Sequence, residues 1–73
     1  MPYQKKHWNG DIVTLQQEVK GWLVILHFQD GKEVGVQLAG ALDLENADRQ
    51  SKELLLTRSH HTCDERCGEW ERT

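Results

Sequence analysis

The chain has 73 residues, 37% of them apolar, and twelve acidic against nine basic side chains give it a formal charge of −3. This length predicts one domain that acts through its surface, because it leaves no room for a second core or for the walls of a deep substrate cleft. The negative charge argues against a protein whose whole surface binds nucleic acid, since such proteins usually carry a basic face. We therefore expect a direct partner other than nucleic acid.

The first residues, MPYQKKHWNG, lack the apolar stretch of a signal peptide. The longest apolar run, Trp22 to Leu26, is far shorter than a membrane span. We therefore expect a cytoplasmic protein with no membrane partner. In a reducing compartment its two cysteines are more often thiols or metal ligands than a disulfide.

Residues 1–10 mix aromatic and basic side chains without periodicity and end in Asn9-Gly10, a strong turn signal. Two interpretations stay open for this head: a frayed terminus, or a flexible arm that binds a partner and can be removed without unfolding the rest. In the second, the aromatic side chains would anchor the contact and the lysines would steer association with an acidic surface. The candidate partner-binding residues are Tyr3, Lys5, Lys6, His7 and Trp8.

Two runs of alternating apolar and polar residues then predict neighbouring strands. From Ile12 to Val19, one face carries Val13, Leu15 and Val19. The next run, GWLVILHFQD, predicts the central strand, and one of its faces carries Trp22, Val24, Leu26 and Phe28.

Asp30-Gly31 separates the central strand from KEVGVQLA, where Val34, Val36 and Leu38 alternate with polar or small residues. An Asp-Gly pair between two such runs predicts a hairpin with a type I′ turn, because both residues tolerate positive φ.

Residues 40–51, GALDLENADRQS, leave two alternatives open. They form one or two helical turns around Ala41, Leu44 and Ala47, or a short strand at Leu42 to Glu45. The segment KELLLTR, residues 52–58, predicts a last strand with Leu54 and Leu56 facing the core. Residues 11–59 therefore predict a mainly β domain: a small antiparallel sheet or an SH3-like or Sm-like barrel, with at most one short helix, between flexible termini.

Residues 60–73 predict a mobile polar tail, because Trp70 is the only large apolar side chain there. The tail contains residue types that bind zinc, namely His60, His61, Cys63 and Cys67. The spacing C-x3-C is not matched by a second cysteine pair, so we assign no metal or other cofactor from the sequence. Zinc binding by these residues stays open as the alternative to thiols in a mobile tail.

Nothing in the sequence predicts catalysis. The histidines are scattered between the head, the central strand and the tail, and we interpret His27 as an ordinary sheet residue. The glycines form no phosphate-binding loop, and no nucleophile, base and orienting group come together in the sequence. We expect no catalytic residues and no enzymatic activity.

A head MPYQKKHW, a hairpin VILHFQDGKEVGV and a polar tail within 73 residues resemble the layout of small host-takeover proteins of bacteriophages. They resemble in particular the RNA-polymerase-binding regulator and antiterminator of a Xanthomonas phage. The resemblance implies a transcription inhibitor in the host cytoplasm that docks Tyr3 to Trp8 on the large subunits of bacterial RNA polymerase. We expect a monomer.

The residues themselves leave other functions open. These alternatives are a small nucleic-acid-binding β domain, a zinc-binding β domain, and an inhibitor of another host complex.

Overall fold

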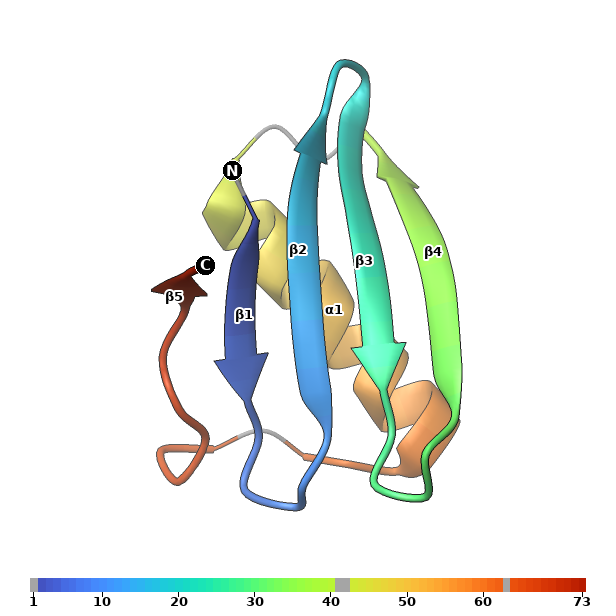
Figure 1. Cartoon of the computed structure of the whole chain (residues 1–73), viewed down its shortest axis with the longest axis vertical. Helices are drawn as coiled ribbons and strands as arrows, with labels where there is room; N and C mark the ends of the chain where they lie inside the picture. The colour runs from blue at the N-terminus through green and yellow to red at the C-terminus, as the bar shows by residue number, and fades with distance from the viewer. Residues whose placement is uncertain (1, 41–42, 63) are drawn as a thin grey trace.

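The computed structural model describes residues 2–40, 43–62 and 64–73. One antiparallel sheet carries one helix on one of its faces (Figure 1). In chain order the elements are β1 (Tyr3–Lys6), β2 (Ile12–Glu18), β3 (Gly21–His27), β4 (Glu33–Ala39), α1 (Leu44–Ser59) and β5 (Glu71–Arg72). Across the sheet the order is β4-β3-β2-β1-β5. The mainly β fold and the antiparallel sheet are confirmed, and over the described residues the sheet is open rather than closed into a barrel.

The strands β2, β3 and β4 pair in the register that the alternation of their side chains requires. Val24 on β3 lies opposite Leu15 on β2 and Val36 on β4. The buried apolar side chains of the sheet are Val13, Leu15, Trp22, Val24, Leu26 and Leu38. Val19 does not share this face, because it lies in the turn after β2 and is fully exposed.

The predicted hairpin between β3 and β4 is confirmed, but its turn differs from the predicted type I′. The N–H of Gly31 donates to the carbonyl of Phe28 at 2.9 Å, and the N–H of Phe28 donates to the carbonyl of Lys32 at 2.8 Å. Gly31 has φ +92°, whereas Asp30 does not have positive φ, because His60 is the only non-glycine residue with positive φ among those described. The loop between the bonded residues Phe28 and Lys32 has three residues, and such loops favour a type I turn followed by a glycine in the left-handed conformation.

The loop between β1 and β2 repeats this arrangement. The N–H of Gly10, with φ +97°, donates to the carbonyl of His7 at 3.0 Å, and the N–H of His7 donates to the carbonyl of Asp11 at 2.9 Å. His7 is therefore the last residue held by the sheet before the chain turns.

The helix α1 begins at an N-cap, where Asp43 accepts a 2.9 Å hydrogen bond from the N–H of Asn46. The side chains that it buries against the sheet are Ala47, Ser51 and Leu55, spaced by four residues along one face. The helical alternative is thereby confirmed for residues 44–51, while Ala41 and Leu42 lie outside the described residues.

The predicted strand at residues 52–58 is wrong, because this segment continues α1 to Ser59. Leu55 is fully buried, Leu54 is half-buried and Leu56 is exposed. Three consecutive leucines fit either period, and here the helical stripe that continues from Ala47 decides which one faces the core. This helix is too short to cross a membrane, and the described residues contain none that is long and apolar enough.

The two ends of the chain belong to the sheet. Tyr3 on β1 pairs with Leu15 on β2 and with Arg72 on β5, so β1 is an inner strand rather than a separate arm. Trp70 packs against the core just before β5. The expected division into arm, domain and tail therefore differs from the structure, because backbone pairing with β2 can recruit a strand whose own side chains are mostly polar.

Candidate functional site

The five residues predicted to bind a partner lie on two sides of the sheet. Lys5 and His7 are buried on the face that carries α1, with 7% and 5% of their surface exposed. Tyr3 is half-buried and packs with its ring centroid 6.1 Å from that of Trp22. Lys6 is exposed, and Trp8 is 47% exposed. The structure therefore leaves Lys6 and Trp8 as the members of this set that a partner can reach directly.

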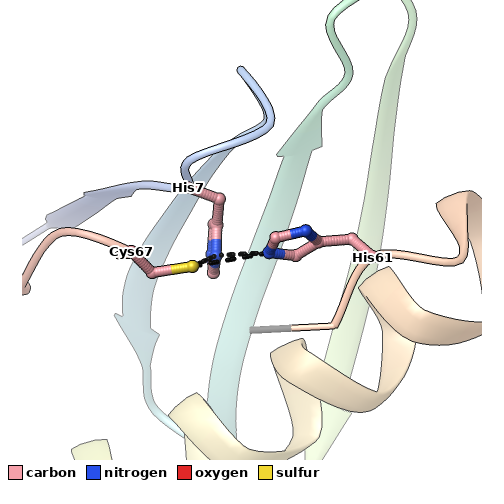
Figure 2. Close-up of side chains that lie close together, drawn as sticks. All are labelled: His7, His61 and Cys67. Atoms are coloured by element: carbon pink, nitrogen blue, oxygen red, sulfur yellow. Dashed lines mark hydrogen bonds between the residues drawn. The ribbon is translucent and has the colours of Figure 1, made fainter. Parts of the chain in front are cut away.

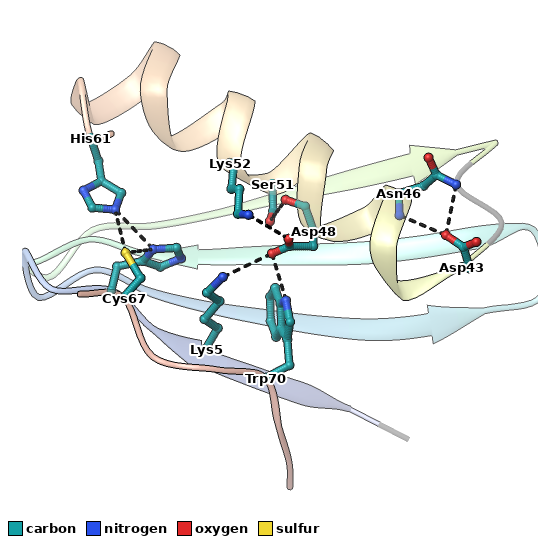
Figure 3. A network of polar contacts seen from close by, with 10 residues as sticks. Lys5, Asp43, Asn46, Asp48, Ser51, Lys52, His61, Cys67 and Trp70 are labelled. Carbon is teal, nitrogen blue, oxygen red and sulfur yellow. Dashed lines mark hydrogen bonds and ion pairs between the residues drawn. The ribbon is translucent and has the colours of Figure 1, made fainter. Parts of the chain in front are cut away.

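Lys5 forms an ion pair with Asp48 on α1, with Nζ 3.4 Å from Oδ1 (Figure 3). The same carboxylate accepts a 2.8 Å hydrogen bond from the indole N–H of Trp70 and pairs with Lys52 at 3.0 Å. Burial alone would raise the pKa of Asp48, but the hydrogen bonds from Lys52 and Trp70 and the charge of Lys5 outweigh it and lower the pKa. Lys5 thus stabilises the fold and is not presented to a partner.

Beside this ion pair, three side chains from distant segments point toward one another (Figure 2). His7 Nδ1 lies 3.2 Å from His61 Nε2 and 3.1 Å from Cys67 Sγ, and the last two atoms are 3.5 Å apart. The two imidazole rings meet edge to face, with centroids 4.9 Å apart. We call these three residues the His-His-Cys cluster.

The interior of the His-His-Cys cluster is shielded from solvent. Both histidines are buried and Cys67 is half-buried. Burial, followed by the neighbouring His61 and Lys5, lowers the pKa of His7 to about 4. At neutral pH His7 is therefore uncharged and presents one nitrogen lone pair, which is the form of imidazole that binds metals.

Each of the three side chains is brought to the cluster by a specific turn. His7 directly follows β1 and is held there by its backbone bond to Asp11. After α1 the chain reverses at His60, which has φ +54°, and the N–H of His61 donates to the carbonyl of Leu55 at 3.3 Å. Cys67 follows a turn in which its own N–H donates to the carbonyl of Asp64 at 3.1 Å.

The sequence indicated two of the three cluster residues, His61 and Cys67, as possible zinc ligands, and it did not indicate His7. Of the four tail residues with zinc-binding chemistry, His61 and Cys67 are in the cluster, His60 is exposed outside it, and Cys63 lies outside the described residues. His7 is 54 residues from His61 and was assigned to a partner-binding arm. Lys5 and His7 are buried on the same face of the sheet, but the sequence around them has no apolar periodicity that predicts this.

An exposed surface covers the edge of the cluster. The guanidinium of Arg66 lies 4.3 Å from the centroid of the Trp8 ring, and the ring centroids of Trp8 and His61 are 5.3 Å apart. The indole N–H of Trp8 donates to the carbonyl of Thr62 at 3.3 Å, and Arg66 pairs with Asp64 at 2.8 Å. We call Trp8 and Arg66 the Trp8 surface.

Comparisons with protein families, with curated protein sequences and with solved structures give no match. The described residues offer two chemically distinctive features. One is the exposed aromatic and cationic side chains of the Trp8 surface, and the other is a cluster of two nitrogens and one sulfur, which are donor atoms that transition metals bind.

Proposed function

We propose that the chain is a small protein-binding regulator that docks on bacterial RNA polymerase, inhibits host transcription initiation and promotes antitermination. The observation that supports a protein contact is the Trp8 surface. Tryptophan and arginine are the residue types that most often dominate binding energy at protein interfaces. The assignment to RNA polymerase rests on the resemblance in layout to phage regulators.

The Trp8 surface has the properties of an anchor that is held in place before binding. Trp8 is 47% exposed although its indole N–H is bonded to Thr62 and its ring is stacked by Arg66. A side chain held in this way loses less conformational entropy when it enters a pocket on a partner. The proposed anchors are therefore Trp8 and Arg66, and no longer Tyr3, Lys5 and His7, which serve the fold.

The test uses the full chain and purified bacterial RNA polymerase, with binding, promoter-dependent initiation and terminator read-through as readouts. Trp8→Ala and Arg66→Ala should each weaken binding by about 30-fold, which corresponds to about 2 kcal/mol for a hot spot. Val19→Ala is the matched control, because Val19 is fully exposed and lies in the turn between β2 and β3, at the other end of the sheet (Figure 1).

Two outcomes would count against the proposal in different ways. No binding of the unaltered chain to the polymerase would reject the partner. Full binding by both Trp8→Ala and Arg66→Ala would reject the Trp8 surface. The contact would then have to lie elsewhere, and the sheet face opposite α1, with the half-buried Leu23 and Ile25, is the next surface to test.

A further inference from the structure

We propose that the His-His-Cys cluster binds one zinc ion through His7 Nδ1, His61 Nε2 and Cys67 Sγ. This site is independent of the polymerase contact: either proposal can fail while the other holds. The assignment rests on the geometry of the three donor atoms, on their burial and on their chemistry.

The distances between the donor atoms lie within about 0.4 Å of those in a tetrahedral zinc site. Zinc bonds of about 2.0 Å to nitrogen and about 2.3 Å to sulfur, at tetrahedral angles, place two nitrogens about 3.3 Å apart and a nitrogen and a sulfur about 3.5 Å apart. The cluster has 3.2 Å between its nitrogens, and 3.1 and 3.5 Å between each nitrogen and the sulfur. The largest change needed on binding is between His7 Nδ1 and Cys67 Sγ, which are 3.1 Å apart and would separate by about 0.4 Å.

Within the described residues, the ring nitrogens of His7 and His61 make hydrogen-bond contacts only inside the cluster. His7 Nε2 and His61 Nδ1, the nitrogens that face away from it, are buried and have no hydrogen-bond partner among the described residues. Without a metal, the contact between His7 Nδ1 and His61 Nε2 is a hydrogen bond only if one of these nitrogens carries a proton and the other does not. A cation, in contrast, is bound by all three lone pairs at once.

The donor set selects the class of metal. Two imidazole nitrogens and one thiolate suit zinc, whereas magnesium and calcium prefer oxygen ligands. On binding, Cys67 releases its proton to solvent and both histidines bind as neutral rings. The described residues supply three ligands, and the fourth tetrahedral position would take a further ligand.

Such an ion would connect the end of β1, the segment after α1 and the turn before β5. The same segments are also joined by the 2.8 Å hydrogen bond from the N–H of Gly68 to the carbonyl of Lys6 and by the 3.3 Å bond from the indole N–H of Trp8 to the carbonyl of Thr62. Small domains with limited cores commonly gain stability from a structural metal. Zinc would therefore stabilise the fold and hold Trp8, which follows His7 directly.

The test measures metal content and cobalt spectra of the purified full chain. We expect one zinc per chain after dialysis against zinc, and a thiolate-to-cobalt absorption band when cobalt replaces it. His7→Ala, His61→Ala and Cys67→Ser should each weaken zinc binding by more than about 100-fold, because even the loss of a residue that only supports a ligand costs 10- to 100-fold. Cys67→Ser should also abolish the thiolate band.

His60→Asn is the matched control, because it removes the adjacent histidine while asparagine tolerates the left-handed backbone at that position. It should keep full affinity, and so should Val19→Ala, which shortens a fully exposed side chain in the turn between β2 and β3. A chain that binds no zinc, or that loses it with His60→Asn and keeps it with His61→Ala, would overturn the proposal.

A second measurement guards against variants that fail to fold. The melting temperature of the unaltered chain should rise with the concentration of free zinc and fall when a chelator is added, since a ligand that binds only the native state stabilises it. Magnesium at the same concentrations should have no effect. A melting temperature that does not respond to zinc would reject the site without any substitution.

Discussion

The indole of Trp70 donates a 2.8 Å hydrogen bond to Asp48, 22 residues earlier in the chain. The same carboxylate oxygen lies 3.4 Å from Lys5 Nζ, so the C-terminal segment, α1 and β1 meet at this single side chain (Figure 3). Lys5 Nζ also lies 5.7 Å from the centroid of the Trp70 ring. The two ends of the chain are thereby attached to the helix by polar contacts.

Trp70→Phe should lower the free energy of unfolding by about 1–2 kcal/mol. The substitution keeps the apolar ring but removes a hydrogen bond to a charged, partly exposed carboxylate. Urea denaturation at pH 7 measures the change. Trp8→Phe is the control, because the indole bond of Trp8 is exposed, and its effect should stay below about 0.5 kcal/mol. Equal effects of the two substitutions would contradict the role assigned to Asp48.

The backbone amides of β1 should exchange with solvent as slowly as those of β2, because β1 pairs on both sides. Hydrogen exchange measured by NMR tests this. Removal of residues 1–8 should abolish the sheet signature in circular dichroism, because it deletes an inner strand. Fast exchange throughout β1, or a folded truncated chain, would restore the interpretation of this segment as a separate arm.

Leu26→Ala should destabilise the domain by about 2–5 kcal/mol, since a fully buried leucine is replaced by a cavity. For a domain of this size such a loss approaches the whole free energy of unfolding. Thermal denaturation gives the comparison with Val19→Ala, which shortens a fully exposed side chain and should change stability by less than about 0.5 kcal/mol. An unchanged melting curve for Leu26→Ala would show that β3 faces the other way.

The contribution of Asp48 to stability should disappear in acid. Its folded pKa is lowered below the ordinary value of 3.8, so the unfolded chain takes up the proton first as the pH falls. The stabilisation is therefore fully present above about pH 4 and is lost as the pH falls through the folded pKa. The difference in unfolding free energy between the unaltered chain and Asp48→Asn should be constant from pH 7 to about pH 5 and shrink below about pH 4.

Glu53→Gln is the control for this pH series, because Glu53 is an exposed carboxylate on the same helix. It should change stability little at any pH in the range. A difference between the unaltered chain and Asp48→Asn that stays constant down to pH 2 would contradict the ion pairs drawn for Asp48.

The strands β2, β3 and β4 could be predicted from the sequence, because in each of them apolar and polar side chains alternate and the apolar ones mark the buried face. Val13, Leu15, Val24 and Leu26 are at their predicted positions for this reason. Residues 52–58 could not be assigned in the same way, because LLL satisfies both a strand and a helix. The face of Ala47, Ser51 and Leu55 presented to the sheet settles that choice.

The sequence by itself determined the antiparallel hairpin at Asp30-Gly31 and the apolar face of the sheet, and it left zinc binding by the tail residues His61 and Cys67 as an open alternative. Only the tertiary structure decided that β1 is an inner strand and that His7 completes the cluster. The physical reason is that periodicity reports the local environment of a segment, whereas the approach of His7 to His61 depends on backbone pairing between β1 and β2 and on the chain reversal at His60. Neither of these contacts leaves a pattern within the ten residues around His7.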